Sequence, residues 1–165
     1  MLADTLATLQ ALDPAILAGP VRQAQGDTTL EILDWAVQPL SHEKIIETTG
    51  GLFLFSGTGR SGTGTKPWTI VLKILNNPKE RKQAPRYWSY WKREQLAFQS
   101  GMLAALPTGI RAPRCYGTME HEEQAWLWIE YIREATGRRW AIEHFHRAAR
   151  HAGRFGAAFL CGSPL

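Results

Sequence analysis

The chain has 165 residues, of which 44% are hydrophobic and seven are Trp, and its formal net charge is +4. This composition excludes an intrinsically disordered protein, and the length is that of one ordinary domain with a substantial core. The charge falls short of that of a typical nucleic-acid-binding protein, and it favours acidic small molecules only weakly.

Hydrophobic spacing predicts the elements of the N-terminal half. A short amphipathic helix comes first, because Leu recurs at positions 2, 6, 9 and 12, and it should end near Asp13-Pro14. Gly19-Pro20 and Gly26-Asp27 then indicate turns. Extended patterns predict three strands, over residues 28–40, 45–56 and 68–75.

The C-terminal half is predicted to contain a helix over 87–105, strands over 111–117 and 124–132, and a last helix over 140–160. The fold class expected is therefore α+β, with a mainly antiparallel sheet of about five strands and a packed helix. Three regions follow along the chain: an N-terminal helical segment (1–27), the sheet lobe (28–132), and a hinge with the last helix (133–165).

The glycines of the second predicted strand and of the segment after it have local explanations. Gly50-Gly51 lies inside the strand and indicates a bulge or a close backbone approach. Gly57–Gly62 matches G-x-G-x-x-G, but no helical pattern begins at its third glycine, as a dinucleotide-binding loop requires. Only residues 63–67 separate it from the next strand, too few for a kinase phosphate loop. We therefore expect residues 57–67 to form a hairpin loop that does not touch nucleotide phosphates.

Two charged residues interrupt otherwise apolar patterns. Lys73 lies in the middle of the strand 68–75, and Glu94 lies on the apolar stripe of the helix 87–105. Burying either charge alone would cost several kcal/mol, so the two are expected to pair. The alternative is that Glu94 lies at the edge of the stripe and reaches solvent. The large apolar members of the stripe are Tyr87, Trp91, Phe98 and Met102.

These residues resemble a known family. Val71-Leu-Lys73 on the third strand, Glu94 on the next helix and the strand ending in 127–132 resemble the N-terminal lobe of aminoglycoside phosphotransferase-like kinases, which include choline kinases. The segment 150–159 is similar to the helix that follows the hinge in many of these proteins. The resemblance covers roughly residues 28–160. It implies that Lys73 contacts the α- and β-phosphates of ATP and that Glu94 holds Lys73 in place.

The resemblance also implies two further parts of a nucleotide site. Glu130, Tyr131 and Ile132 would form a hinge whose backbone groups meet the edge of adenine. The turn over the phosphates would be formed by residues 41–45, which include Ser41 and His42. The structural alternative for Glu130 and Tyr131 is a strand end that meets water.

The chain departs from the family where catalysis is concerned. Phosphoryl transfer needs a catalytic Asp and a second Asp that holds Mg²⁺, yet all four Asp residues lie at or before position 34. No His-x-Asp occurs, and no catalytic or metal-binding residue can be assigned. We expect the chain to hold part of ATP without catalysing its transfer, whereas a complete enzyme would use Mg²⁺ to phosphorylate a small-molecule hydroxyl.

The last predicted helix carries a long apolar stripe. We expect this face to pack against a C-terminal lobe that the chain lacks, to fold back on the sheet, or to self-associate through residues 142–159. The members of the stripe are Ile142, Phe145, Ala149, Ala152, Gly156 and Phe159.

Two other functions remain open at the level of sequence. One is a non-catalytic binding or regulatory module. The other is nucleic-acid binding by basic and aromatic residues interleaved over 79–93, although a solvated face beside a core stripe accounts for that pattern better. The histidines lack the spacing of metal ligands.

The compartment follows from what the sequence lacks. Residues 1–20 carry two Asp and no Lys or Arg, which argues against a secretory signal, and no apolar run approaches membrane-spanning length. Cys115 and Cys161 are isolated thiols, as free cysteines in the cytosol are. We therefore expect a soluble, cytoplasmic protein without a membrane partner.

Overall fold

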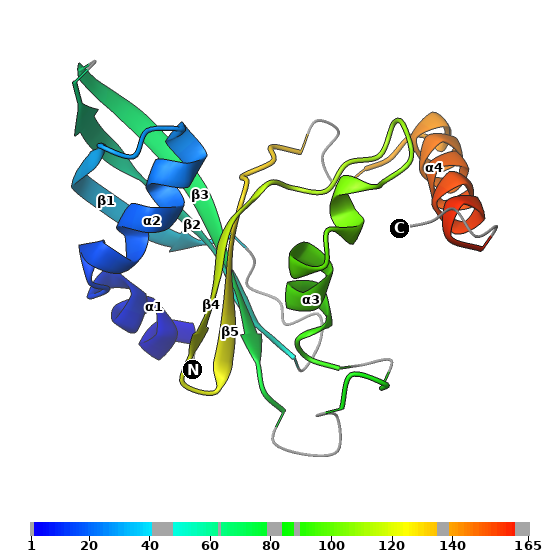
Figure 1. Cartoon of the computed structure of the whole chain (residues 1–165), viewed down its shortest axis with the longest axis horizontal. Helices are drawn as coiled ribbons and strands as arrows, with labels where there is room; N and C mark the ends of the chain where they lie inside the picture. The colour runs from blue at the N-terminus through cyan, green and yellow to red at the C-terminus, as the bar shows by residue number, and fades with distance from the viewer. Residues whose placement is uncertain are drawn as a thin grey trace. The chain divides into compact units, whose positions relative to one another are not determined.

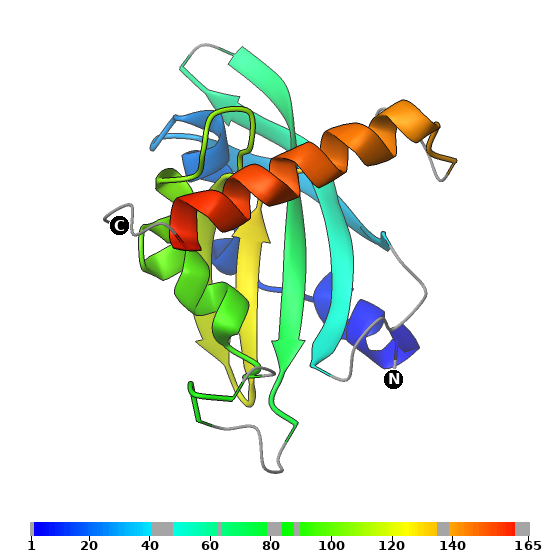
Figure 2. The same cartoon turned by 90° about the vertical axis from the view of Figure 1, so that its right-hand side faces the viewer.

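A computed structural model of the chain describes residues 2–40, 48–62, 64–78, 84–87, 90–134 and 139–160. Within these residues, five strands form one antiparallel sheet in the order β1-β2-β3-β5-β4, and Figure 2 shows the succession β2, β3, β5, β4. The α+β class and the five-stranded sheet predicted from the sequence are confirmed. The elements are α1 (Leu2–Gln10), α2 (Pro14–Gln25), β1 (Glu31–Pro39), β2 (Thr49–Ser61), β3 (Gly64–Asn76), α3 (Arg93–Gln99), a 3₁₀ turn (Met102–Ala104), β4 (Cys115–His121), β5 (Gln124–Ile129) and α4 (Ile142–Leu160).

The chain divides into two compact units. The first comprises residues 1–95 and 114–131, and it holds α1, α2, the whole sheet and the first turn of α3. The second comprises residues 96–113 and 132–165, and it holds the rest of α3 and α4. The sheet and the predicted site residue Lys73 therefore belong to the same unit.

The main core lies between the sheet and the two N-terminal helices, which cover one of its faces (Figure 1). Strand alternation explains which residues enter it, because every second side chain points to the same side. The core members from β3 are the even-numbered Trp68, Ile70, Leu72 and Ile74. The helices and the segment between them contribute Leu9, Leu12, Leu17 and Val21, and the neighbouring strands contribute Phe53, Phe55, Trp126 and Trp128.

The sequence prediction missed α2. It placed a helix end at Asp13-Pro14 and a turn at Gly19-Pro20, whereas α2 begins at Pro14 and continues past Pro20. Asp13 caps the helix by accepting a 2.8 Å hydrogen bond from the N–H of Ala15, and Pro suits the first helical turn. An internal Pro costs about 3 kcal/mol. Complete burial of Leu17 and Val21 offsets this, at roughly 2 kcal/mol each.

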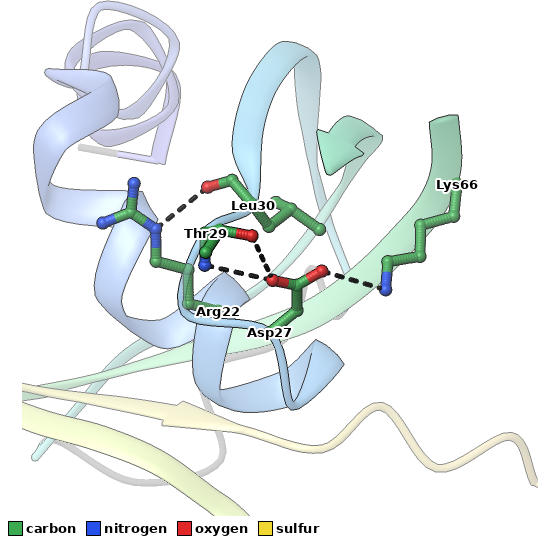
Figure 3. A network of polar contacts seen from close by, with 5 residues as sticks. All are labelled: Arg22, Asp27, Thr29, Leu30 and Lys66. Carbon is green, nitrogen blue, oxygen red and sulfur yellow. Dashed lines mark hydrogen bonds and ion pairs between the residues drawn. The ribbon is translucent and has the colours of Figure 1, made fainter. Parts of the chain in front are cut away.

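A polar network fastens the end of α2 to the sheet (Figure 3). Arg22 Nε donates to the carbonyl of Leu30 at 2.9 Å, and Asp27 Oδ2 lies 3.5 Å from Lys66 Nζ on β3. The hydroxyl and the N–H of Thr29 both donate to Asp27 Oδ1, at 2.8 and 3.0 Å. These bonds, the hydroxyl first, lower the pKa of Asp27 to about 2, because they stabilise the ionised form.

The predicted hairpin between β2 and β3 exists, but the expectation of a long loop was wrong. β2 continues to Ser61 and β3 begins at Gly64, so most of residues 57–67 lie in paired strands. Gly57 is required by a close approach, because a Cβ there would lie 2.1 Å from the carbonyl oxygen of Asp34 on β1. The G-x-G-x-x-G match therefore reflects strand packing.

The predicted long helix over 87–105 was also wrong in its extent. α3 begins only at Arg93, after turns in which the N–H of Tyr90 donates to Tyr87 and that of Arg93 donates to Tyr90. Arg93 Nη2 also donates to the carbonyl of Tyr87, at 2.5 Å. Aromatic residues lose rotamer freedom in helices, so local turns compete well here. At the other end, Gly101 adopts a left-handed conformation with φ +78 and stops the helix.

In the second unit, α4 is a single unbroken helix, drawn in orange to red in Figure 2. It confirms the helix predicted over 140–160 to within two residues at its start. None of its residues is buried, and Ile142, Phe145 and Leu160 are exposed by 60%, 55% and 88%. No helix among the described residues has the length and apolarity to cross a membrane.

Candidate functional site

Lys73 and Glu94 form the ion pair that the sequence predicts. Lys73 Nζ donates to Glu94 Oε2 at 2.5 Å, and both residues belong to the first unit. The side chain of Lys73 is 22% exposed and that of Glu94 is 37% exposed. The pair is thus partly covered, and its charges keep access to solvent or to a ligand.

Lys73 lies on the face of the sheet opposite the main core. Its neighbours on β3, Leu72 and Ile74, point into the core beneath α1 and α2, so alternation turns Lys73 to the other side. There it is flanked in register by Leu52 on β2 and Leu127 on β5. The prediction of an inward strand position is therefore refined: β3 is covered on both faces, and Lys73 lies on the one without N-terminal helices.

The ammonium of Lys73 retains bonding capacity. It has three N–H donors, of which Glu94 accepts one. Within the described part of the chain no second acceptor contacts it. An ammonium that is held in place, is 22% exposed and has two further donors is suited to hold an anionic oxygen, such as that of a phosphate.

Glu94 is positioned by the start of α3. It lies in the first helical turn, where the partial positive charge of the helix end favours a carboxylate. Its neighbours Trp91 and Gln95 are buried, with 8% and 4% exposure, and they anchor this turn in the first unit. Glu94 is paired with Lys73 and also reaches solvent, as the alternative expected, since its side chain is 37% exposed.

The backbone next to Lys73 bulges as the paired glycines predicted. The register between β2 and β3 shifts between Thr49 and Gly51, and Gly51 has φ +139. A Cβ on Gly50 would lie 2.6 Å from Ile74 Cγ2, so both a bulge and a close approach are present. Ser41 and His42, predicted to lie in the turn over the phosphates, fall outside the described residues.

The predicted hinge residues follow β5. The N–H of Glu130 donates to the carbonyl of Arg114 at 2.8 Å, and the N–H of Arg114 donates to Glu130 Oε2 at 3.1 Å. That backbone N–H of Glu130 is therefore already used within the protein. Tyr131 is half-buried at the end of the first unit, and Ile132, at the start of the second, is 49% exposed.

Sequence analysis missed the partner of this strand end. Arg114 precedes β4, and its carbonyl accepts the N–H of Glu130, which continues the β4–β5 ladder past the assigned strands, while its own N–H donates to the side-chain carboxylate of Glu130. A main-chain contact of this kind leaves no side-chain signal, so only the strand pairing could have suggested it. The pairing fixes where the chain leaves the sheet, next to the predicted hinge.

Of the basic and aromatic residues described over 79–93, Arg86 and Tyr87 are exposed and lie against each other, whereas Trp91, Lys92 and Arg93 are engaged within the protein. Trp91 is buried, Lys92 pairs with Glu120 on β4 and lies over the Trp91 ring, and Arg93 is bonded to Tyr87. These contacts support the structural explanation of the pattern. Lys79, Arg81, Lys82 and Trp88 lie outside the described residues.

Three Asp carboxylates of the first unit have structural roles. Asp13 caps α2, Asp27 closes the α2–β1 connection, and Asp34 accepts bonds from the N–H and hydroxyl of Thr58. Among the described residues no group of three or more His, Cys, Asp or Glu side chains is placed to hold a metal ion.

Comparison with family models, with curated proteins and with solved structures found no match to this chain.

Proposed function

We propose that the first unit is the nucleotide-binding lobe of an ATP-dependent small-molecule phosphotransferase, and that Lys73 binds a phosphate of the nucleotide. The observation that carries this proposal is the Lys73–Glu94 ion pair, which fixes a partly exposed ammonium on the face of the central strand opposite the main core. The carboxylate orients the ammonium and lowers the cost of its partial burial. Among the described residues, two of its donors are left for phosphate oxygens.

The order of the elements supports the same proposal. Along the chain, β3 with Lys73 is followed by the helix that carries Glu94. The β4–β5 hairpin comes next, and it ends at the predicted hinge. Lys73 lies on β3 and Glu130 directly follows the neighbouring strand β5, three positions after Leu127, the register partner of Lys73. That offset corresponds to roughly 10 Å. One elongated ligand can therefore meet both the ammonium and the strand end.

The described residues fit ATP better than they fit Mg²⁺. An ammonium with free donors suits phosphate, but Mg²⁺ prefers carboxylate oxygens, and the described Asp residues serve the N-terminal helices and strands. We therefore assign nucleotide binding to this chain and no step of phosphoryl transfer. Bound Mg²⁺ in a complete enzyme would neutralise the charge that develops on the transferred group, and its ligands would come from elsewhere. The small-molecule hydroxyl that accepts the phosphoryl group would be bound by that complete enzyme. We also propose that the protein is cytoplasmic.

Titration calorimetry with ATP and with adenosine tests this assignment. Lys73→Met should weaken ATP binding at least tenfold, which is about 1.4 kcal/mol. The same substitution should leave adenosine binding within about twofold, because adenosine has no phosphate for the ammonium to hold. Glu94→Gln should weaken ATP binding by less than Lys73→Met does, since it removes the orienting carboxylate and keeps the ammonium.

A matched control is offered by Lys66, which lies on the same strand and pairs with Asp27 at the far end of the hairpin. Lys66→Met removes the same charge from β3 and should leave ATP affinity nearly unchanged. Equal losses for the two lysine variants would show a general electrostatic effect. A chain that binds neither ATP nor adenosine at millimolar concentration would refute the proposal.

A non-catalytic, regulatory role is the second candidate, and the distribution of acidic residues favours it. No Asp follows position 34, so the chain offers no acid–base Asp downstream of Lys73. We expect the chain alone to show no ATP turnover even where it binds ATP. Turnover that is abolished by Lys73→Met would overturn this expectation and establish a complete kinase.

A further inference from the structure

The positive charge of the chain is concentrated in the second unit. Residues 96–113 and 132–165 contain seven Arg and no Lys against two Glu and no Asp, so the formal net charge of this unit is +5. Because the whole chain has a net charge of +4, the larger first unit has −1. The charge is therefore mild as an average over the chain and high within one of its units, an asymmetry typical of binding to a polyanion.

The basic side chains of the two units also differ in their partners. In the first unit, Arg60, Lys66, Lys73 and Lys92 each pair with a carboxylate. Five arginines of the second unit, by contrast, are exposed and form no ion pair within the described part of the chain. Their guanidinium groups are therefore available to an anionic partner. These arginines are Arg133, Arg139, Arg147, Arg150 and Arg154.

Three of them form an arginine ridge on α4. Arg147, Arg150 and Arg154 recur at intervals of 3 and 4 residues, which places them on one side of the helix, about half a turn from the apolar stripe. The ridge spans about 10 Å along the helix axis, a length over which one strand at duplex spacing carries roughly three phosphates. Glu143, the one carboxylate of α4, lies before the ridge. Guanidinium groups bind phosphate oxygens in a bidentate manner, so the ridge is suited to a phosphate backbone.

Exposed aromatic side chains follow exposed arginines in the same unit. Trp140 follows Arg139 and is 44% exposed, and Phe155 follows Arg154 at the end of the ridge and is 41% exposed. Rings of this kind are platforms on which unpaired bases stack, while neighbouring basic groups bind the backbone. The bases of a duplex are already stacked on one another, so the combination favours a single strand.

We propose that the second unit binds single-stranded nucleic acid, with the arginine ridge on the phosphates and Phe155 stacked on a base. The charge of this unit and the unpaired state of its described arginines favour a polyanion, and the exposed rings favour one that carries bases. This surface is separate from Lys73, which belongs to the first unit, so the proposal does not depend on ATP binding. Inorganic polyphosphate would satisfy the arginines equally well but offers no base to Phe155.

Fluorescence anisotropy of a labelled oligouridylate with the full chain tests the ridge. With about 15 nucleotides and about 50 mM salt, we expect a dissociation constant in the micromolar range. Replacing all three ridge arginines by Gln should weaken binding at least tenfold, and each arginine removed should reduce the slope of log K against log salt by about 0.7. Gln has nearly the helix propensity of Arg, and circular dichroism verifies that the helix content is unchanged.

The matched control replaces three exposed arginines of the first unit by Gln, namely Arg60, Arg86 and Arg114. It changes the net charge by the same amount and should alter the dissociation constant by less than about threefold. Lys73→Met should leave it within about twofold, which separates this surface from the nucleotide site. Equal losses for the ridge variant and the control variant would overturn the assignment of the surface.

Phe155→Leu tests the stacking contact. It should weaken binding of the oligouridylate about fivefold or more and leave binding of inorganic polyphosphate unchanged. Affinity for polyphosphate or for anionic lipid vesicles that matches the affinity for the oligouridylate would show that the surface recognises charge alone, and would overturn the proposal. A chain at about 100 μM that binds no oligouridylate in about 50 mM salt would overturn it as well.

Discussion

The contribution of the Lys73–Glu94 pair to folding is open to a direct measurement. The perturbation is Glu94→Gln, which keeps the shape of the side chain and removes its charge, combined with Lys73→Met in a double-mutant cycle. Removing the carboxylate alone leaves the ammonium partly covered and without its partner. The coupling free energy then isolates the pair from the separate effects of each side chain.

The exposure of the two side chains sets the expected magnitude of the coupling free energy. A fully buried lysine deprived of its carboxylate would cost about 3 kcal/mol or more, whereas exposed ion pairs contribute about 0.2–1 kcal/mol. At 22% and 37% exposure, Lys73 and Glu94 fall between these cases. We expect a coupling of about 1–2 kcal/mol, which corresponds to a shift in Tm of roughly 2–8 °C.

Urea unfolding of the four proteins in the cycle measures this coupling. The Lys92–Glu120 pair is the control, since its carboxylate side chain is 62% exposed and its coupling should stay below about 1 kcal/mol. Raising the salt concentration should reduce the coupling of the control pair more than that of Lys73–Glu94. A coupling near zero for Lys73–Glu94 would mean that the ammonium is solvated and the pairing is incidental.

Three further predictions concern the fold and the glycine-rich hairpin. Because the folded-state pKa of Asp27 is depressed from 3.8 to about 2, its ionised form stabilises the protein above about pH 4; the stability difference between wild type and Asp27→Asn should shrink as the pH falls from 4 towards 2 in acid-unfolding curves, and a constant difference would contradict this. Gly57→Ala should lower the free energy of unfolding by about 2 kcal/mol or more, since its Cβ would meet the backbone of β1, whereas Gly62→Ala, with open space around it, should change it by less than about 0.5 kcal/mol. Gly59→Ala combined with Gly62→Ala should leave ATP affinity within a few-fold once folding is verified, and a hundredfold loss would show that the hairpin touches the phosphates.

The sheet was predictable because an apolar, extended pattern is a local property of the sequence. Short, largely apolar runs marked β2, β3 and β5, and the pair Gly50-Gly51 marked the bulge. The second helix was not predictable from the same rules, because Pro20 argues against a helix unless the burial of Leu17 and Val21 is known. That burial depends on the sheet onto which the helix packs, which lies later in the chain.

The candidate site was predicted in part for a related reason. Charges inside apolar patterns identified Lys73 and Glu94, because burying each alone is costly and their pairing is chemically simple. Predicting the sheet face on which they meet required knowledge of the whole sheet. Alternation places Lys73 opposite the core only when Leu72 and Ile74 are known to lie beneath α1 and α2. Helix phase was less reliable: the stripe that began at Tyr87 lies outside α3 until Arg93.

Because side chains alternate along β3, residues needed for folding and a residue needed for ligand binding occur within the same six consecutive positions. In a library that randomises residues 70–75, survival of the folded state should constrain Ile70, Leu72 and Ile74, while retention of a ligand would constrain Lys73. The ligand could therefore change in evolution without cost to the core. A slip of one residue in the β2–β3 pairing would exchange the two faces and bury the ammonium, so the short connection between Ser61 and Gly64, which sets the continuous register from Gly51 to Ser61, protects both properties at once.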